Sequence, residues 1–81
     1  MMNKELALTD PQLAFWYAND IVKGPWKEAE DIISTCAFES WRYAKFVIKG
    51  RFTIGESTIK KNPIMKTTYE NHFNIELKTA A

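Results

Sequence analysis

The sequence predicts an all-α protein in which short antiparallel helix pairs stack as a small helical bundle or solenoid. Three observations support this prediction. The segment YANDIVKGPWKEAE, which begins at Tyr17, is followed 26 residues later by YAKFVIKGRFTIGE, which begins at Tyr43, and a further 26 residues lead to Tyr69. Apolar residues in each copy recur at spacings of three and four, as on one buried face of a helix. Self-similarity at a period of roughly 20 to 50 residues is typical of stacked units that cannot bury their apolar faces alone.

The period divides the chain into units within one domain, residues 1–81. Repeat 1 spans about residues 10–35, repeat 2 about 36–61 and a partial repeat 3 about 62–81, which makes two and a half repeats of about 26 residues. The opening ELAL resembles the end of a preceding second helix, so we expect it to cap the array. A chain of this size removes about 60% of its unfolded surface from water, enough for one modest core.

The first helix of each unit begins at an N-cap residue and ends at a glycine. Asp10 and Asn62 are favourable N-cap residues, and each is followed by a proline suited to the first helical position. We expect Gly24 and Gly50 to end these helices, because the residue just past a helix often adopts a positive φ that glycine tolerates best. The residues expected on the buried face are Leu13, Trp16, Tyr17 and Ile21 in the first copy and Trp41, Ala44, Val47 and Ile48 in the second.

The second helix of each unit is predicted to be short. Pro25 can open it in the first copy, and Thr53 with Glu56 three residues later forms a potential capping box in the second. Gly55 weakens that helix by about 1 kcal/mol relative to alanine, so packing must support it. The expected inward residues are Trp26, Ala29, Ile32, Ile33, Ile54 and Ile59. In total we expect about five or six helices.

One segment also fits a β-hairpin. FVIKGRFTI carries β-branched and aromatic residues on both sides of a Lys-Gly-Arg turn. The equivalent segment of the first copy, IVKGPWKEA, contains a proline and continues into a strongly helical stretch. Because both copies should fold alike, the repeat favours helix.

Charge and hydropathy argue against several classes of partner. The net charge is +1, so no strong field attracts nucleic acid, although KGPW and KGRF place a basic residue near an aromatic one. No apolar run approaches the roughly 20 residues of a spanning helix, so we expect no direct membrane insertion. A single cysteine, Cys36, and the lack of a leader segment favour a reducing cytoplasm.

The residue types needed for catalysis are sparse, so we predict a non-enzyme with no catalytic, cofactor-binding or metal-binding residues. His72 is the sole histidine, and Cys36 takes the position held by Asp10 in the first unit, which favours a capping or packing role. Glu30 and Glu56 recur at the same position, and we interpret them as helix-surface charges that pair with nearby lysines. No glycine-rich phosphate-binding pattern surrounds the glycines.

Positions at which the copies differ indicate a contact surface. A core position should stay apolar in every unit, yet Phe46 occupies the position of Asp20 and His72. Exposed aromatic residues in a small chain favour a partner surface or self-association, and homo-oligomerisation would also cover the open ends of the array. The alternative is that Phe46 packs on an irregular cap. The predicted partner-binding residues are Trp16, Trp41, Arg42 and Phe46.

The two copies resemble a short helical repeat of proteins from T-even-type and related tailed phages, with a consensus close to YAxDVIKGRWPEGE. YANDIVKGPWKEAE and YAKFVIKGRFTIGE carry the resemblance, which covers about residues 9–73. The chain departs from this pattern at Pro25, where arginine is common, and at Phe52-Thr53, where Trp-Pro is common. The repeat is specific for the fold and much less so for a function.

Among small phage proteins, the chain is similar to lysis-inhibition accessory proteins. This similarity implies an antiholin in the host cell cytoplasm, which binds the cytoplasmic part of the phage holin and delays lysis without catalysis. Two alternatives stay open at this point: a phage inhibitor of a host enzyme or defence system, and a nucleic-acid binder.

Overall fold

The computed structural model describes residues 3–77, and it confirms the all-α prediction, because that range contains no strand. The first helices of the units are α2 (Pro11–Tyr17), which continues into the π-helix η1 (Ala18–Val22), α4 (Ala37–Arg42), which continues into the π-helix η3 (Tyr43–Ile48), and α6 (Pro63–Phe73). The second helices are α1 (Lys4–Ala7), the 3-10 turn η2 (Lys27–Ala29) with α3 (Glu30–Ile33), and the 3-10 turn η4 (Thr53–Gly55) with α5 (Glu56–Lys60).

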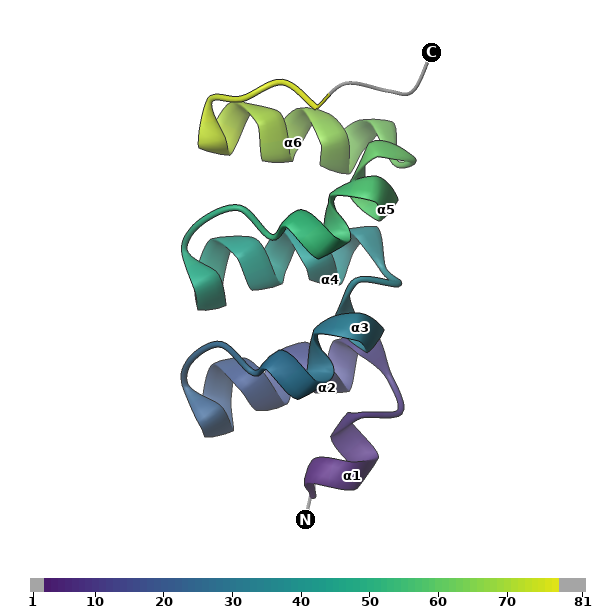
Figure 1. Ribbon diagram of the computed structural model, residues 1–81, viewed down its shortest axis with the longest axis vertical. Coiled ribbons are helices and arrows are strands. Elements are labelled where there is room, and N and C mark those ends of the chain that lie inside the picture. Colours follow the sequence, from purple (N-terminus) through teal and green to yellow (C-terminus); the bar gives the residue numbers. More distant parts are fainter. Residues whose placement is uncertain (1–2, 78–81) are drawn as a thin grey trace.

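The helices form an elongated stack. Figure 1 shows α2, α4 and α6 one above another, while α1, α3 and α5 lie together along one side of that stack. The molecule measures 43 × 21 × 18 Å along its principal axes. The opening ELAL forms α1 in the position of a second helix, as expected. The predicted partial repeat 3 supplies α6, and its last four residues lie outside the described range.

The predicted N-caps are confirmed. The Asp10 carboxylate accepts hydrogen bonds from the backbone N–H groups of Gln12 and Leu13, and the Asn62 side-chain oxygen accepts two in the same way at the start of α6. A proline follows each cap at the first helical position. Cys36 takes the cap position of α4, where its side chain makes no capping hydrogen bond. Two of the three first helices are thus started by local sequence alone.

The prediction that Gly24 and Gly50 adopt the positive φ was wrong. The left-handed residues are Lys23, Lys49 and Asn74, with φ of 60°, 59° and 55°, and neither glycine has a positive φ. The reversal falls at the lysine, one residue before each glycine, after a π-helical last turn that holds one more residue than an α-helical turn.

Hydrogen bonds show this extra residue directly. The Lys23 N–H donates to the Ala18 carbonyl at 2.7 Å, a bond that spans five residues instead of four. In α6 there is no π turn, and the reversal falls at Asn74, one repeat position earlier than at Lys49. The Ile75 N–H then donates to the Glu70 carbonyl at 3.0 Å, which is the usual hydrogen bond at the end of an α-helix whose last residue is left-handed.

A buried tyrosine joins each unit to the next, and we call this contact the tyrosine bridge. The Tyr43 hydroxyl accepts a hydrogen bond from the Trp26 N–H and donates one to the Glu30 carboxylate, both at 2.8 Å. The side chain of Tyr43 is fully buried, and its burial raises the pKa of its hydroxyl above the usual value. The interpretation of Glu30 as a lysine-paired surface charge was therefore wrong.

The second tyrosine bridge repeats the first and adds an ion pair. Tyr69 accepts from the Phe52 N–H at 3.0 Å and donates to the Glu56 carboxylate at 2.6 Å. Arg51 donates to both oxygens of that carboxylate at 2.8 Å, which holds the pKa of Glu56 below its usual range. The predicted Thr53 capping box does not form, because η4 starts without a side-chain cap.

The apolar core runs along the whole stack between the two rows of helices. Its buried residues are Ala7, Ala14, Phe15, Ala18, Trp26, Ala29, Ile33, Trp41, Tyr43, Ala44, Val47, Phe52, Ile59, Tyr69 and Leu77. Ile21 and Ile54, which were expected to face inward, are half exposed. Ile21 lies in a π turn and Ile54 in a 3-10 turn, and neither turn keeps the α-helical spacing that the prediction assumed.

We predict that Tyr69→Phe lowers the free energy of unfolding by about 1 to 3 kcal/mol. The substitution keeps the ring but leaves the buried Phe52 N–H without its acceptor and removes a hydrogen bond from Glu56. Urea denaturation followed by circular dichroism measures the change.

Tyr17→Phe is the matched control. Tyr17 occupies the same repeat position, but it precedes both bridges, and no hydrogen bond to its hydroxyl occurs within residues 3–77. We expect this variant to change stability by less than about 0.5 kcal/mol. Equal losses for the two variants would show that the bridge does not join the units.

We also predict that Gly55→Ala destabilises the fold by about 1 to 3 kcal/mol through overpacking. A Cβ at Gly55 would lie 2.6 Å from the Ser40 hydroxyl oxygen and 2.7 Å from a ring carbon of Phe52. Unit 1 has alanine at both equivalent positions, Ala14 and Ala29. Gly55→Ala combined with Ser40→Ala should therefore recover part of the loss in the same urea experiment, and no recovery would contradict a steric cause.

Candidate protein-binding face

The first helices expose aromatic and cationic side chains on the side turned away from the second helices. Ala14 and Ala18 are buried toward the second helices, so residues two positions away along α2 point outward. Trp16 is 39% exposed, and in the next unit Phe38 and Phe46 are 48% and 50% exposed. We call this surface the outer face and define it by Trp16, Phe38, Arg42, Lys45 and Phe46.

Arg42 sits at the centre of the outer face between two aromatic rings. Its guanidinium carbon lies 4.3 Å from the ring centre of Phe15 and 5.2 Å from that of Phe38. The same guanidinium donates to the Glu39 carboxylate at 3.2 Å. Two rings and one carboxylate therefore fix the position of this cation, so the face presents an ordered positive charge.

Phe46 is held on one side and open on the other. Its ring centre lies 6.5 Å from that of Phe15, in the neighbouring unit, and the Lys45 ammonium lies 5.0 Å from it. The sequence left open whether Phe46 is exposed or packed on an irregular cap, and half of the side chain is exposed. Apolar area of this kind, beside positive charge, is a common feature of protein interfaces.

Trp41 belongs to the core, although it was among the predicted partner-binding residues. It is 8% exposed, and its ring makes edge contacts with Tyr69, His72 and Phe73 of the next unit, with ring centres 5.1 to 6.3 Å apart. Arg42 and Phe46 meet at Phe15 on the outer face and Trp16 is exposed on α2, whereas Trp41 packs between units 2 and 3.

Two residues of the outer face were missed by sequence reasoning. Phe38 and Lys45 took no part in the prediction, although Phe38 occupies the position of the polar Gln12 in the first unit. A helical spacing of four links Phe38, Arg42 and Phe46, and this pattern could have identified Phe38.

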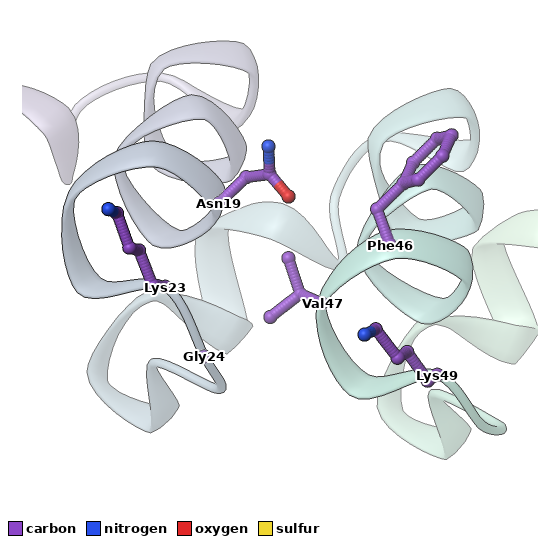
Figure 2. Close-up of a pocket in the computed structure, with 6 residues that line it drawn as sticks. All are labelled: Asn19, Lys23, Gly24, Phe46, Val47 and Lys49. Carbon is purple, nitrogen blue, oxygen red and sulfur yellow. The ribbon is translucent and has the colours of Figure 1, made fainter.

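A pocket of about 280 Å³ opens beside Phe46, where the π-helical ends of units 1 and 2 meet. It is lined by Asn19, Lys23, Gly24, Phe46, Val47 and Lys49. Figure 2 shows Asn19 and Val47 between the two helix ends, with Phe46 and Lys49 on the η3 side and Lys23 on the η1 side. The pocket therefore combines an apolar wall with two cationic side chains.

The described part of the chain provides few other candidate sites. Within residues 3–77, no group of three or more His, Cys, Asp and Glu side chains is placed to hold a metal ion. No helix in that range combines the length and the apolar character needed to cross a bilayer.

The comparisons with known proteins identify no relative. The chain matches no protein-family model, no curated protein and no solved structure at a level that would show a relationship. The outer face and the resemblance of the repeat are therefore the two observations that bear on function.

We predict an unusual pH dependence for the carboxylate that supports Arg42. Burial raises the pKa of Glu39, and this effect outweighs the attraction of the Arg42 guanidinium. The folded state then binds a proton more readily than the unfolded state, so the contribution of Glu39 to stability is present below the unfolded pKa and is lost as pH rises through the folded pKa.

The comparison uses Glu39→Gln, which cannot titrate. The free energy of unfolding of the natural chain minus that of the variant should fall as pH rises above the usual pKa of a glutamate, about 4.3. Urea denaturation of both proteins at several pH values measures this difference, and a difference that rises with pH would contradict the assignment.

Proposed function

We propose that this chain is an antiholin: a phage lysis-inhibition accessory protein that binds the cytoplasmic part of the holin and delays host lysis. Binding takes place in the host cell cytoplasm and involves no catalysis. The repeat resembles that of T-even phage proteins, and the chain as a whole resembles the lysis-inhibition accessory protein RIII of those phages.

The observation that carries the binding function is the outer face. Three large aromatic side chains, Trp16, Phe38 and Phe46, remain substantially exposed on a small protein whose other large aromatic rings are buried or partly buried. Arg42 lies over the rings of Phe15 and Phe38. Aromatic residues and arginine are the side chains most enriched among those that dominate binding energy at protein interfaces. Recognition of a protein by shape and charge is the function that such a surface supports best.

The test is a direct binding measurement with the purified chain and the soluble cytoplasmic segment of the holin. We expect saturable binding by isothermal titration calorimetry with a dissociation constant in the micromolar range or tighter. No binding at tens of micromolar would rule out the antiholin function. Capture with crosslinking during infection then identifies the partner, and recovery of a host enzyme or defence protein in place of the holin would favour an inhibitor.

We predict that Phe46→Ala weakens binding to the holin segment by about fivefold or more. The side chain is half exposed, so the thermal midpoint should stay nearly unchanged, and a large loss of stability would place Phe46 in the core instead.

Ile54→Ala is the matched control for Phe46→Ala. Ile54 is also 50% exposed, but it lies in η4, among the second helices and away from the outer face. Its substitution should leave the affinity within about twofold. Equal effects of the two substitutions would show that binding does not use the outer face.

A further inference from the structure

We propose that the pocket between η1 and η3 binds a carboxylate side chain of an acidic amphipathic segment of the partner, whose apolar side chains pack on Phe46. This inference deepens the proposed function, because it states the chemistry of the segment that the partner presents. The occupant is a protein segment, and the lysines of the pocket bind its negative charge.

The charges around the pocket favour an anionic ligand. Lys23 and Lys49 line the pocket, and neither forms an ion pair within residues 3–77. Lys45 adds a third ammonium beside Phe46. The opposing charge nearby is Asp20, whose carboxylate accepts a hydrogen bond from Asn19 at 2.9 Å. The pocket rim is therefore net positive, although the whole chain carries only +1.

The backbone conformation of the two lysines also indicates that their side chains have a role. Lys23 and Lys49 both adopt the left-handed conformation, which is unfavourable for a residue other than glycine or asparagine. The third unit uses asparagine for its reversal, at Asn74. Helix termination therefore does not account for lysine at both positions, whereas a need for two ammonium groups at the rim does.

The apolar wall of the pocket favours a protein segment over a nucleic acid as the ligand. Phe46 and Val47 form one side of the pocket, and the exposed Phe38 and Trp16 extend this apolar surface along the outer face. A phosphate backbone would gain little from these apolar residues. An amphipathic protein segment can use both features, because its apolar side chains cover the aromatic residues while a carboxylate reaches the lysines.

Figure 2 shows where the two lysine side chains lie at the pocket. The Lys49 ammonium lies close to the space between the helix ends, whereas the Lys23 side chain extends away from it. A lysine side chain has a flexible four-carbon stem, so Lys23 can turn toward the pocket when a negative charge arrives.

The experiment removes both charges and keeps the backbone conformation. In Lys23→Asn/Lys49→Asn, asparagine suits the left-handed positions, as Asn74 does in the third unit, so the fold should keep its thermal midpoint or gain stability. The control is Lys27→Asn/Lys61→Asn, which removes the same charge from exposed residues among the second helices.

The probe is a synthetic amphipathic peptide of about 15 residues with glutamate on one face and leucine and tryptophan on the other, compared with an analogue carrying glutamine for glutamate. We expect the acidic peptide to bind the natural chain and the control alike, and to bind Lys23→Asn/Lys49→Asn roughly fivefold or more weakly at low salt. Amide chemical shifts should change at Phe46 and Val47. Equal binding of the glutamine analogue, equal binding by both double variants, or tighter binding of single-stranded DNA than of the acidic peptide would overturn the proposal.

The same variants separate this inference from the antiholin function. If the holin segment binds the natural chain and Lys23→Asn/Lys49→Asn equally, the pocket proposal fails and the antiholin function stands. If the acidic peptide binds through the pocket but the holin segment does not bind at all, the pocket proposal stands and the antiholin function fails.

Discussion

The hydrogen bonds of the tyrosine hydroxyls to the preceding unit are the constraint on which the rest of the fold depends. The second helices α3 and α5 span only four and five residues, too few to form alone in water. Each is held by a buried tyrosine of the following unit. The tyrosine hydroxyl accepts a hydrogen bond from a backbone N–H and donates one to a glutamate carboxylate. Because the tyrosine and its glutamate lie 13 residues apart in both copies, this contact also fixes the register of each unit on the next.

This register determines which side of each first helix stays free. Small residues such as Ala14, Ala18 and Ala44 let the second helices approach closely, so the polar bridges and the apolar core share the inner side. On the outer side, Arg42 and Phe46 also pack on Phe15 of unit 1, but the residues of this side differ from one unit to the next. Gln12 corresponds to Phe38, and Trp16 to Arg42. A surface that changes along the stack suits recognition of one partner better than it suits a repeated structural contact.

The sequence predicted the helix pairs well, because the period of 26 residues, the two N-cap residues each followed by a proline, and the apolar spacing all reflect local structure. It failed where a feature depends on contacts between units. The roles of Glu30 and Glu56 require knowledge that a tyrosine of the next unit reaches them. The left-handed lysines require the π turns, and a glycine directly after each lysine misleads an argument from propensity alone. Trp41 and Phe46 both looked like contact residues, and only their packing against different units separates them.

The π turns determine which residue reverses the chain at each helix end, and so which side chains surround the junction of two units. In units 1 and 2 the extra residue carries the reversal to a lysine, and the two lysines flank the junction at which Phe46 is exposed. At the junction of units 2 and 3 the equivalent positions hold His72 in place of Phe46 and Ile75 in place of Lys49. The His72 ring packs against Trp41, and Ile75 is partly buried against the core. The same repeat thus covers the core at one junction and presents a cationic, aromatic surface at the other, which is where the proposed acidic segment would bind.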